Sequence, residues 1–285
     1  MSTPAVQLVR LDLDGQARWV VRTADSDSLL AVSLDDLLRV PLDEARALVE
    51  SAVPTGHLSG GVLAPVESQE VWAAGVTYEQ SRDGRIEEST EGDVYERVYL
   101  AQRPEVFFKA TAQRVVSDGQ PVGVRIDSPW NAPEPELGLV LNAAGEVFGY
   151  VPGNDVSSRS IEGENPLYLP QAKVYDRSCA LGPGIVPVWA APELPFLIAM
   201  RVQRGDVLAF EGSTSTASIM RGFDDLAAWL MAALDFPVGA VLLTGTGIVP
   251  DDSFSLQAGD LVTVDIAGIG ALSNPVVQVG RDLTR

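Results

Sequence analysis

The chain is short of histidine, cysteine and basic residues. It has one histidine, His57, and one cysteine, Cys179, among 285 residues. A zinc site built from several histidines or cysteines, a CxxC redox motif and an intrachain disulfide are therefore excluded. The 20 Lys and Arg residues stand against 39 Asp and Glu residues, which gives a net charge of −19. This excess of negative charge disfavours nucleic acids and anionic membrane surfaces as partners.

The sequence also lacks a long apolar run. The longest candidate, residues 227–234, is far shorter than the roughly 20 residues that a membrane-spanning helix needs. The first residues contain no basic segment followed by an apolar one, so we expect no signal peptide and a cytoplasmic protein. Since 46% of the residues are hydrophobic, the chain can build a packed core. With histidine and cysteine so scarce, catalysis would rely on carboxylates, lysines, hydroxyl groups and a hard metal ion.

Hydrophobic patterns predict a small N-terminal module. Alternation over residues 6–22, with an Asp14-Gly15 turn, predicts a β-hairpin. Ser33 can cap a helix over residues 34–39, and apolar residues recur at helical spacing from residue 42 to residue 52. The Gly- and Pro-rich stretch 53–66 is interpreted as a linker. Residues 1–65 would then form the module with its linker, and residues 66–285 the main domain.

The main domain is predicted to be mainly β. Strand-like segments occur at residues 105–109, 137–141, 147–151, 199–202, 207–210, 241–244, 261–266 and 276–279. One amphipathic helix interrupts them, over about residues 223–234. This pattern favours an α+β fold with mixed sheets over a doubly wound parallel sheet.

Two glutamates stand two residues apart in the segment PEPEL at residues 133–137. On an extended strand such residues point to the same face, so Glu134 and Glu136 project side by side. Two carboxylates held together share a proton or bind a cation, and an all-oxygen site favours Mg²⁺, Mn²⁺ or Ca²⁺. The spacing alone favours a simpler alternative, two solvated glutamates that protect an edge strand. Asp155 could add a third carboxylate, but on its own is more simply explained as a helix cap or turn residue.

Several ordered motifs together resemble the fumarylacetoacetate hydrolase superfamily. In chain order they are EPEL at 134–137, GY at 149–150, NDVSSR at 154–159, Lys173, LGP at 181–183, LTGTG at 243–247, LQAGD at 256–260, GIG at 268–270 and NPV at 274–276. The resemblance covers roughly residues 70–280. It implies a mixed β-sandwich roll, a homodimer or homotetramer, and Mg²⁺, with Mn²⁺ or Ca²⁺ as substitutes. Carried over to this chain, the metal ligands are Glu134, Glu136 and Asp155.

One departure separates this chain from the hydrolytic members of that family. Those members have a histidine soon after the strand that opens the domain, where it activates water. The matching segment here, residues 75–89, contains no histidine. The strings GVTYEQSR at 75–82 and IEGENPLYLPQAK at 161–173 instead resemble a sugar-acid branch. That branch dehydrates 2-keto-3-deoxy-pentonates, so the resemblance implies formation of 2,5-dioxopentanoate from substrates derived from D-arabinonate or D-xylonate.

The same branch places Glu105 and Lys173 in its active site, and we expect both to transfer protons. Glu105 opens an apolar strand, where burial would raise the pKa of a carboxylate, although an exposed strand-end charge is the alternative. Lys173 is expected to neutralise the substrate or to transfer a proton. Its alternative role is a surface ion pair with Glu162, Glu164 or Asp176.

Four further residues are expected to contact the substrate, namely Ser81, Arg82, Lys109 and Thr246. Arg82 suits bidentate binding of a carboxylate, with a solvated helix face as the alternative. The turn around Thr246 offers backbone N–H groups and a hydroxyl to a carboxylate. Lys109 borders the active site in the family that the chain resembles.

Three functions compete at this stage. The first is a Mg²⁺-dependent dehydratase of a small sugar acid, with neither nucleic acid nor membrane as a partner. The second is a hydrolase or decarboxylase of a diketo acid or acylpyruvate that uses the same metal site. The third is a non-catalytic binding member of the family. The missing histidine argues against the second function, and the intact acidic triad argues against the third.

Overall fold

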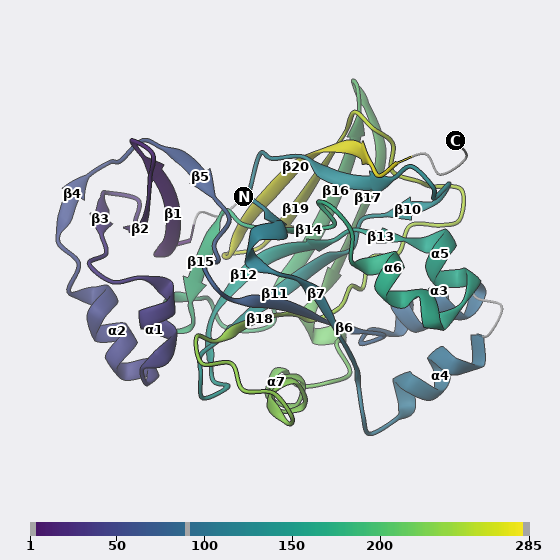
Figure 1. The fold of residues 1–285 in the computed structure, drawn as a ribbon, viewed down its shortest axis with the longest axis horizontal. Helices are drawn as coiled ribbons and strands as arrows, with labels where there is room; N and C mark the ends of the chain where they lie inside the picture. The colour runs from purple at the N-terminus through teal and green to yellow at the C-terminus, as the bar shows by residue number, and fades with distance from the viewer. Residues whose placement is uncertain (1–3, 89–91, 282–285) are drawn as a thin grey trace.

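The computed structural model describes residues 4–88 and 92–281, which form two large sheets and a small two-stranded one, with helices around them (Figure 1). One 13-stranded sheet runs through the molecule, and its main path follows the order β4-β3-β2-β1-β15-β12-β11-β18-β6-β7. A 5-stranded sheet has the order β17-β16-β19-β20-β9. Parallel and antiparallel pairs both occur, so the predicted α+β, mainly β fold with mixed sheets is confirmed.

The N-terminal module supplies one end of the large sheet. Its elements are β1 (Gln7–Leu13), β2 (Gln16–Arg22), β3 (Asp27–Leu29), α1 (Leu34–Arg39), α2 (Leu42–Glu50), β4 (Pro54–Gly56) and β5 (Gly61–Leu63). The predicted hairpin is confirmed, and its turn residues Asp14 and Gly15 both have positive φ. Ser33 caps α1 through a reciprocal hydrogen-bonded capping box with Asp36. These elements form where the local sequence predicts them because turns and caps depend on neighbouring residues.

The stretch 53–66 is not a plain linker, which corrects the interpretation of its Gly and Pro residues. It contains β4, which pairs with β3, and β5, which pairs with β1. Strand β1 also pairs with β15 (Gly184–Pro187), so the module continues the sheet of the main domain. The boundary between residues 65 and 66 stays a prediction.

The site lies on the part of the large sheet that the main domain supplies. Besides β15, its strands are β6 (Glu70–Gly75), β7 (Glu105–Ala110), β8 (Val115–Val116), β11 (Pro135–Leu141), β12 (Val147–Asp155), β14 (Cys179–Leu181) and β18 (Ala240–Leu243). Strand β11 is buried along its whole length and lies between β12 and β18. Side chains on one face of these strands pack against α1, so the module covers that face of the sheet.

The second sheet covers the opposite face. It consists of β9 (Val122–Arg125), β16 (Leu197–Arg204), β17 (Val207–Ser215), β19 (Asp260–Ile266) and β20 (Gly270–Val279). Buried and exposed residues alternate along β16, as expected for a half-buried strand. A continuous core joins β11, β16, β19 and α7 (Phe223–Met231). Helix α7 confirms the predicted amphipathic helix but ends three residues earlier.

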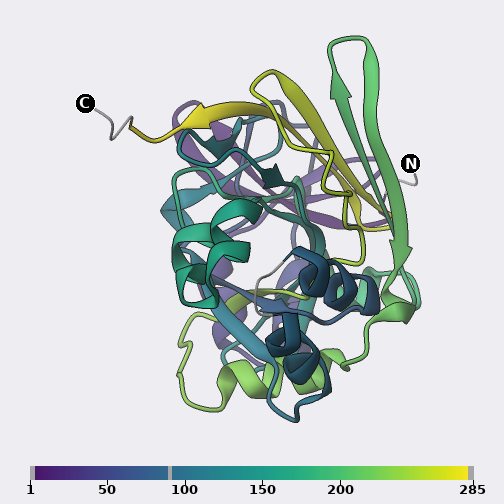
Figure 2. The same cartoon turned by 90° about the vertical axis from the view of Figure 1, so that its right-hand side faces the viewer.

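Short helices gather at one side of the molecule, as Figure 2 shows face-on. They are α3 (Glu79–Glu88), α4 (Gly92–Leu100), α5 (Arg159–Glu164) and α6 (Leu169–Lys173), and α3 contacts α5. The remaining pieces are β10 (Asn131–Ala132), β13 (Ser157–Ser158) and the 3-10 turns η1 (Ala112–Arg114), η2 (Pro166–Tyr168), η3 (Val188–Ala190) and η4 (Thr216–Ser218). Within the described ranges, no helix is long and apolar enough to span a membrane.

Candidate active site

Two neighbouring strands bring three carboxylates together. Glu134 directly precedes β11, Glu136 lies on it, and Asp155 ends the paired strand β12. The register sets Pro135 opposite Asn154, and the Asp155 N–H donates to the Glu134 carbonyl at 2.9 Å. One carboxylate oxygen from each residue lies within 4.8 Å of the other two, and all three residues are buried. The structure thus assembles the three residues that we expected to ligate a metal.

Both simpler alternatives for these carboxylates are wrong. Strand β11 is not an edge strand, and Glu134 and Glu136 are 3% and 1% exposed, so they are not solvated charges that protect an edge. Asp155 does not cap the following helix, because Ser158 is the cap residue of α5 and accepts the Ile161 N–H. The buried carboxylates require compensation from other charged or polar groups.

Glu136 is held by a backbone donor from a distant loop. The Gly245 N–H donates to Glu136 Oε2 at 2.6 Å. Gly245 has φ of +88°, and a Cβ added there would lie 2.1 Å from Thr77 Oγ1, so only glycine fits this approach. Burial raises the pKa of Glu136 well above its usual value, and the charges of Asp155 and Glu134 raise it further. A bound cation would favour the ionised form and offset this cost.

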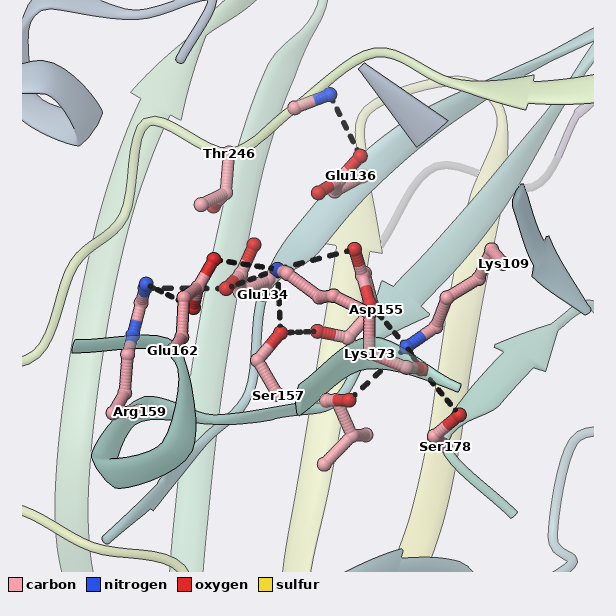
Figure 3. Close-up of polar contacts among 12 residues, drawn as sticks. Lys109, Glu134, Glu136, Asp155, Ser157, Arg159, Glu162, Lys173, Ser178 and Thr246 are labelled. Atoms are coloured by element: carbon pink, nitrogen blue, oxygen red, sulfur yellow. Dashed lines mark hydrogen bonds and ion pairs between the residues drawn. The ribbon is translucent and has the colours of Figure 1, made fainter. Parts of the chain in front are cut away.

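Lys173, at the end of α6, lies among the carboxylates rather than on the surface (Figure 3). Its Nζ donates to Glu134 Oε1 at 2.8 Å and to Ser157 Oγ at 2.6 Å, and lies 3.3 Å from Asp155 Oδ2. Glu162 Oε1 lies 3.9 Å from the same nitrogen. The alternative role of Lys173, a surface ion pair, is therefore wrong, because its contact with Glu162 is buried and forms part of the site.

Lys109, on β7, lies behind the triad and does not line the pocket. The side chain is fully buried and pairs with Asp155 Oδ1. Its Nζ also donates to the carbonyls of Val156 at 3.1 Å and Lys173 at 2.6 Å. These contacts position Asp155 and the backbone that carries Lys173, so Lys109 supports the site from behind.

Arg159 and Glu162 on α5 belong to the site but were not among the expected site residues. Both are buried, and Arg159 Nη1 lies 3.4 Å from Glu162 Oε2. Arg159 Nη2 lies 3.2 Å from Glu134 Oε1, so the guanidinium bridges the two glutamates. The sequence signal available was the three-residue spacing of opposite charges on a helix, which is common on solvated helices and does not indicate burial.

A small pocket opens in front of the triad. Its lining consists of Ala74, Gly75, Val76, Ser81, Glu105, Phe107, Glu134, Glu136, Asp155, Glu162, Lys173, Gly245 and Thr246. Glu105 packs against Gly75 on the paired strand, where an added Cβ would lie 2.0 Å from its Oε2. Glu105, Lys173, Ser81 and Thr246 therefore reach the same pocket as the triad.

Arg82 does not line this pocket, unlike its neighbour Ser81. Its guanidinium pairs with Glu79 at 3.2 Å and Asp83 at 2.7 Å on its own helix, and stacks over the Tyr99 ring. A substrate contact by Arg82 stays a prediction and would require this guanidinium to leave its ion pairs.

The site fits a hard divalent cation. Its donor set consists of carboxylate oxygens, which are ligands that Mg²⁺ prefers. Among the described residues, five carboxylates meet three cations here: Glu105, Glu134, Glu136, Asp155 and Glu162 against Lys109, Arg159 and Lys173. A divalent cation bound among these carboxylates would help to offset the cost of burying them.

The chain belongs to the family described as Fumarylacetoacetate (FAA) hydrolase C-terminal, whose model matches residues 71–277. This confirms the resemblance that the ordered motifs predict. The chain is 48% identical over 245 residues to a Haloferax volcanii protein named "Probable 2-keto-3-deoxyxylonate dehydratase". That match covers 86% of this chain and 83% of the relative.

Two further relatives belong to the same branch. The chain is 41% identical over 223 residues to the "2-dehydro-3-deoxy-D-arabinonate dehydratase" of Saccharolobus solfataricus, which covers 75% of this chain and 74% of the relative. A solved structure described as "2-keto-3-deoxy-D-arabinonate dehydratase complexed with magnesium and 2,5-dioxopentanoate" superposes with a TM-score of 0.83 and 32% identity. That superposition covers 96% of this chain and all of the solved chain.

Proposed function

We propose that this protein is a magnesium-dependent dehydratase that converts a 2-keto-3-deoxy-pentonate to 2,5-dioxopentanoate. The main structural support is the buried triad of Glu134, Glu136 and Asp155, which lines the same pocket as Lys173 and Glu105. The relatives named as dehydratases of such sugar acids support this substrate class. The chain's one histidine, His57, lies between β4 and β5 in the N-terminal module, so no histidine activates water in this pocket.

Glu134, Glu136 and Asp155 would hold the metal ion. Bound magnesium would supply Lewis-acid polarisation of the keto acid, which makes the C3 protons more acidic. Lys109 holds Asp155 from behind, and the Gly245 N–H holds Glu136, so the ligands are oriented before the substrate arrives. Ser81 and Thr246 line the pocket and are assigned to the substrate's carboxylate and hydroxyl groups.

Two pocket residues would move the protons. Glu105 accepts a proton from C3 as the C3–H bond breaks, and Lys173 delivers a proton to the C4 hydroxyl, which leaves as water. Later proton shifts convert the C5 alcohol to an aldehyde. The substrate thus loses one molecule of water overall, and no water molecule acts as a nucleophile.

Incubation of the purified protein with Mg²⁺ and each 2-keto-3-deoxy-pentonate tests the assignment. We expect 2,5-dioxopentanoate, identified by mass spectrometry and by its aldehyde signal in NMR. A parallel incubation uses an acylpyruvate and an oxaloacetate solution. Cleavage of the acylpyruvate without turnover of any pentonate would favour a hydrolase, and binding without turnover would favour a non-catalytic protein.

Glu136→Gln tests the metal site. The substitution keeps the shape of the side chain but removes one of the charges that would bind the cation. We expect a loss of Mg²⁺ affinity of at least about 100-fold, with a matching loss of activity at limiting Mg²⁺. Calorimetric titration with MgCl₂ measures the affinity. A variant with wild-type affinity and activity would refute the ligand assignment.

We also propose a cytoplasmic homodimer or homotetramer. Leu194, Leu197 and Val207 are exposed by 51%, 65% and 66%, and self-association would cover such apolar surface. Light scattering coupled to gel filtration measures the mass, and a monomer at micromolar concentration would contradict the oligomer.

A further inference from the structure

Lys173 and a bound cation would compete for the same carboxylates. The Lys173 ammonium contacts Glu134 Oε1 at 2.8 Å and Asp155 Oδ2 at 3.3 Å, and these two residues are two of the three proposed ligands. A divalent cation that binds there repels a positive charge held so close. Cation binding is therefore coupled to the position of this one side chain.

Glu162 lies where a displaced ammonium would go. Its Oε1 is 3.9 Å from Lys173 Nζ, longer than a hydrogen bond but within the range of an ion pair. Glu162 lies on α5, is 4% exposed and lines the pocket, and Figure 3 shows it between Arg159 and the Lys173 ammonium. A shift of about 1 Å would convert this contact into a charge-assisted hydrogen bond.

Arg159 keeps Glu162 in place during such a shift. Its guanidinium spans Glu162 Oε2 at 3.4 Å and Glu134 Oε1 at 3.2 Å. Lys173 and Arg159 thus share one oxygen of Glu134. When the ammonium moves, Glu134 keeps the arginine as a partner, so the move leaves no buried carboxylate without a cation.

We propose that Glu162 is a positioning residue for Lys173, which draws the ammonium away from Glu134 and Asp155 when a divalent cation binds. The inference rests on the proposed metal site and adds a function for a residue outside it. Glu162 acts through Lys173 and not on the cation directly. We therefore expect Glu162 to affect the affinity for the cation only when the Lys173 ammonium is present.

A double-mutant cycle tests this dependence. Wild type, Glu162→Gln, Lys173→Met and the double variant are stripped of metal and titrated with MgCl₂ in a calorimeter. We expect Glu162→Gln to weaken Mg²⁺ binding about ten-fold, the size typical of residues that orient metal ligands. We expect Lys173→Met to bind Mg²⁺ more tightly than wild type, because the competing cation is gone. In the Lys173→Met background, Glu162→Gln should change the affinity by less than about two-fold.

Glu164→Gln is the matched control. It makes the same charge change on the same helix at an exposed position, and we expect wild-type Mg²⁺ affinity. Equal weakening by Glu162→Gln in both backgrounds would overturn the proposal, since plain electrostatic attraction to the cation would then suffice. If Glu162→Gln fails to fold, the Lys173→Met variant can still refute the proposal. Weaker Mg²⁺ binding by that variant would contradict competition between the Lys173 ammonium and the cation. Absence of Mg²⁺ binding by folded wild type would instead refute the metal site itself.

Discussion

At the scale of single residues, the site depends on a glycine whose backbone N–H comes close enough to donate to the Glu136 carboxylate. Glu136 receives its hydrogen bond from a residue 109 positions later in the chain, and the donor is a glycine with left-handed backbone. Thr77 Oγ1 donates to the neighbouring Thr244 carbonyl at 2.6 Å and occupies the space that a Cβ would need. The ligand geometry therefore includes a close backbone approach as well as three carboxylates.

Gly245→Ala should damage both stability and metal binding. The Cβ would overlap Thr77 Oγ1, and alanine is strained at φ of +88°. We expect a loss of about 3 kcal/mol in the free energy of unfolding, measured in urea, and weaker Mg²⁺ binding by calorimetry. Gly259→Ala is the matched control, because φ is +94° there but nothing lies within 4 Å. It should cost only about 1–2 kcal/mol and leave Mg²⁺ affinity unchanged. Equal effects of the two substitutions would refute the role of the close approach.

At the scale of elements, a buried ion pair ties together the pieces of the N-terminal module. Asp27 on β3 is fully buried. Its carboxylate accepts two hydrogen bonds from the Arg22 guanidinium on β2, at 2.9 and 3.0 Å, and one from the Leu58 N–H at 2.8 Å. Strands β2 and β3 and the segment between β4 and β5 thus share one carboxylate. This contact explains why the expected linker is ordered against the module.

This ion pair predicts an acid-sensitive module. The hydrogen bond from Arg22 lowers the pKa of Asp27 more than burial raises it, so its folded-state pKa lies below the unfolded value of about 3.9. The stabilisation is present above that value and is lost as pH falls through the folded-state pKa. Asp27→Asn should cost about 2 kcal/mol at neutral pH and flatten the loss of stability below about pH 4.

Thermal unfolding between neutral and acidic pH measures both effects of Asp27→Asn. Asp12→Asn makes the same chemical change at an exposed position of β1 and should follow the wild-type curve. If Asp27→Asn retains the wild-type acid dependence, another group is responsible for it.

At the scale of the whole molecule, the net charge of −19 opposes the binding of any anion. At the site itself, Lys109, Arg159 and Lys173 are buried among the carboxylates and offset part of their negative charge. A divalent cation would add the remaining positive charge where the substrate's carboxylate and keto groups would lie. We therefore expect binding of the anionic substrate to depend on the divalent cation.

Magnesium should stabilise the protein beyond its effect as a salt. Any added salt screens the repulsion among surface carboxylates, whereas binding at one site adds about 2.7 kcal/mol at a hundred-fold excess over the dissociation constant. We expect the melting temperature to rise by about 5 °C or more in MgCl₂ relative to NaCl of equal ionic strength. The extra rise should disappear in Glu136→Gln. Identical melting curves in the two salts would argue against a specific site.

Much of the local structure could be predicted because its causes are local. The Asp14-Gly15 turn, the Ser33 cap and the main strands follow from residues next to one another. The stretch 53–66 was misinterpreted because its strands pair with β1 and β3, and short strands depend on partners that local composition does not reveal.

The sequence by itself limited the metal chemistry to oxygen ligands, because it has too few histidines and cysteines for a zinc site. The ligand set Glu134, Glu136 and Asp155 followed from the resemblance to the family, since the spacing of the carboxylates alone favoured solvated side chains. Only the tertiary structure decided which charges are buried. It placed Lys109 behind Asp155, brought Arg159 and Glu162 into the site and paired Arg82 on its own helix. The physical reason is that the cost of burying a charge depends on everything packed around it. Here those surroundings come from β7, β12, α5 and α6, and from the loop at Gly245, which lies 109 residues after Glu136.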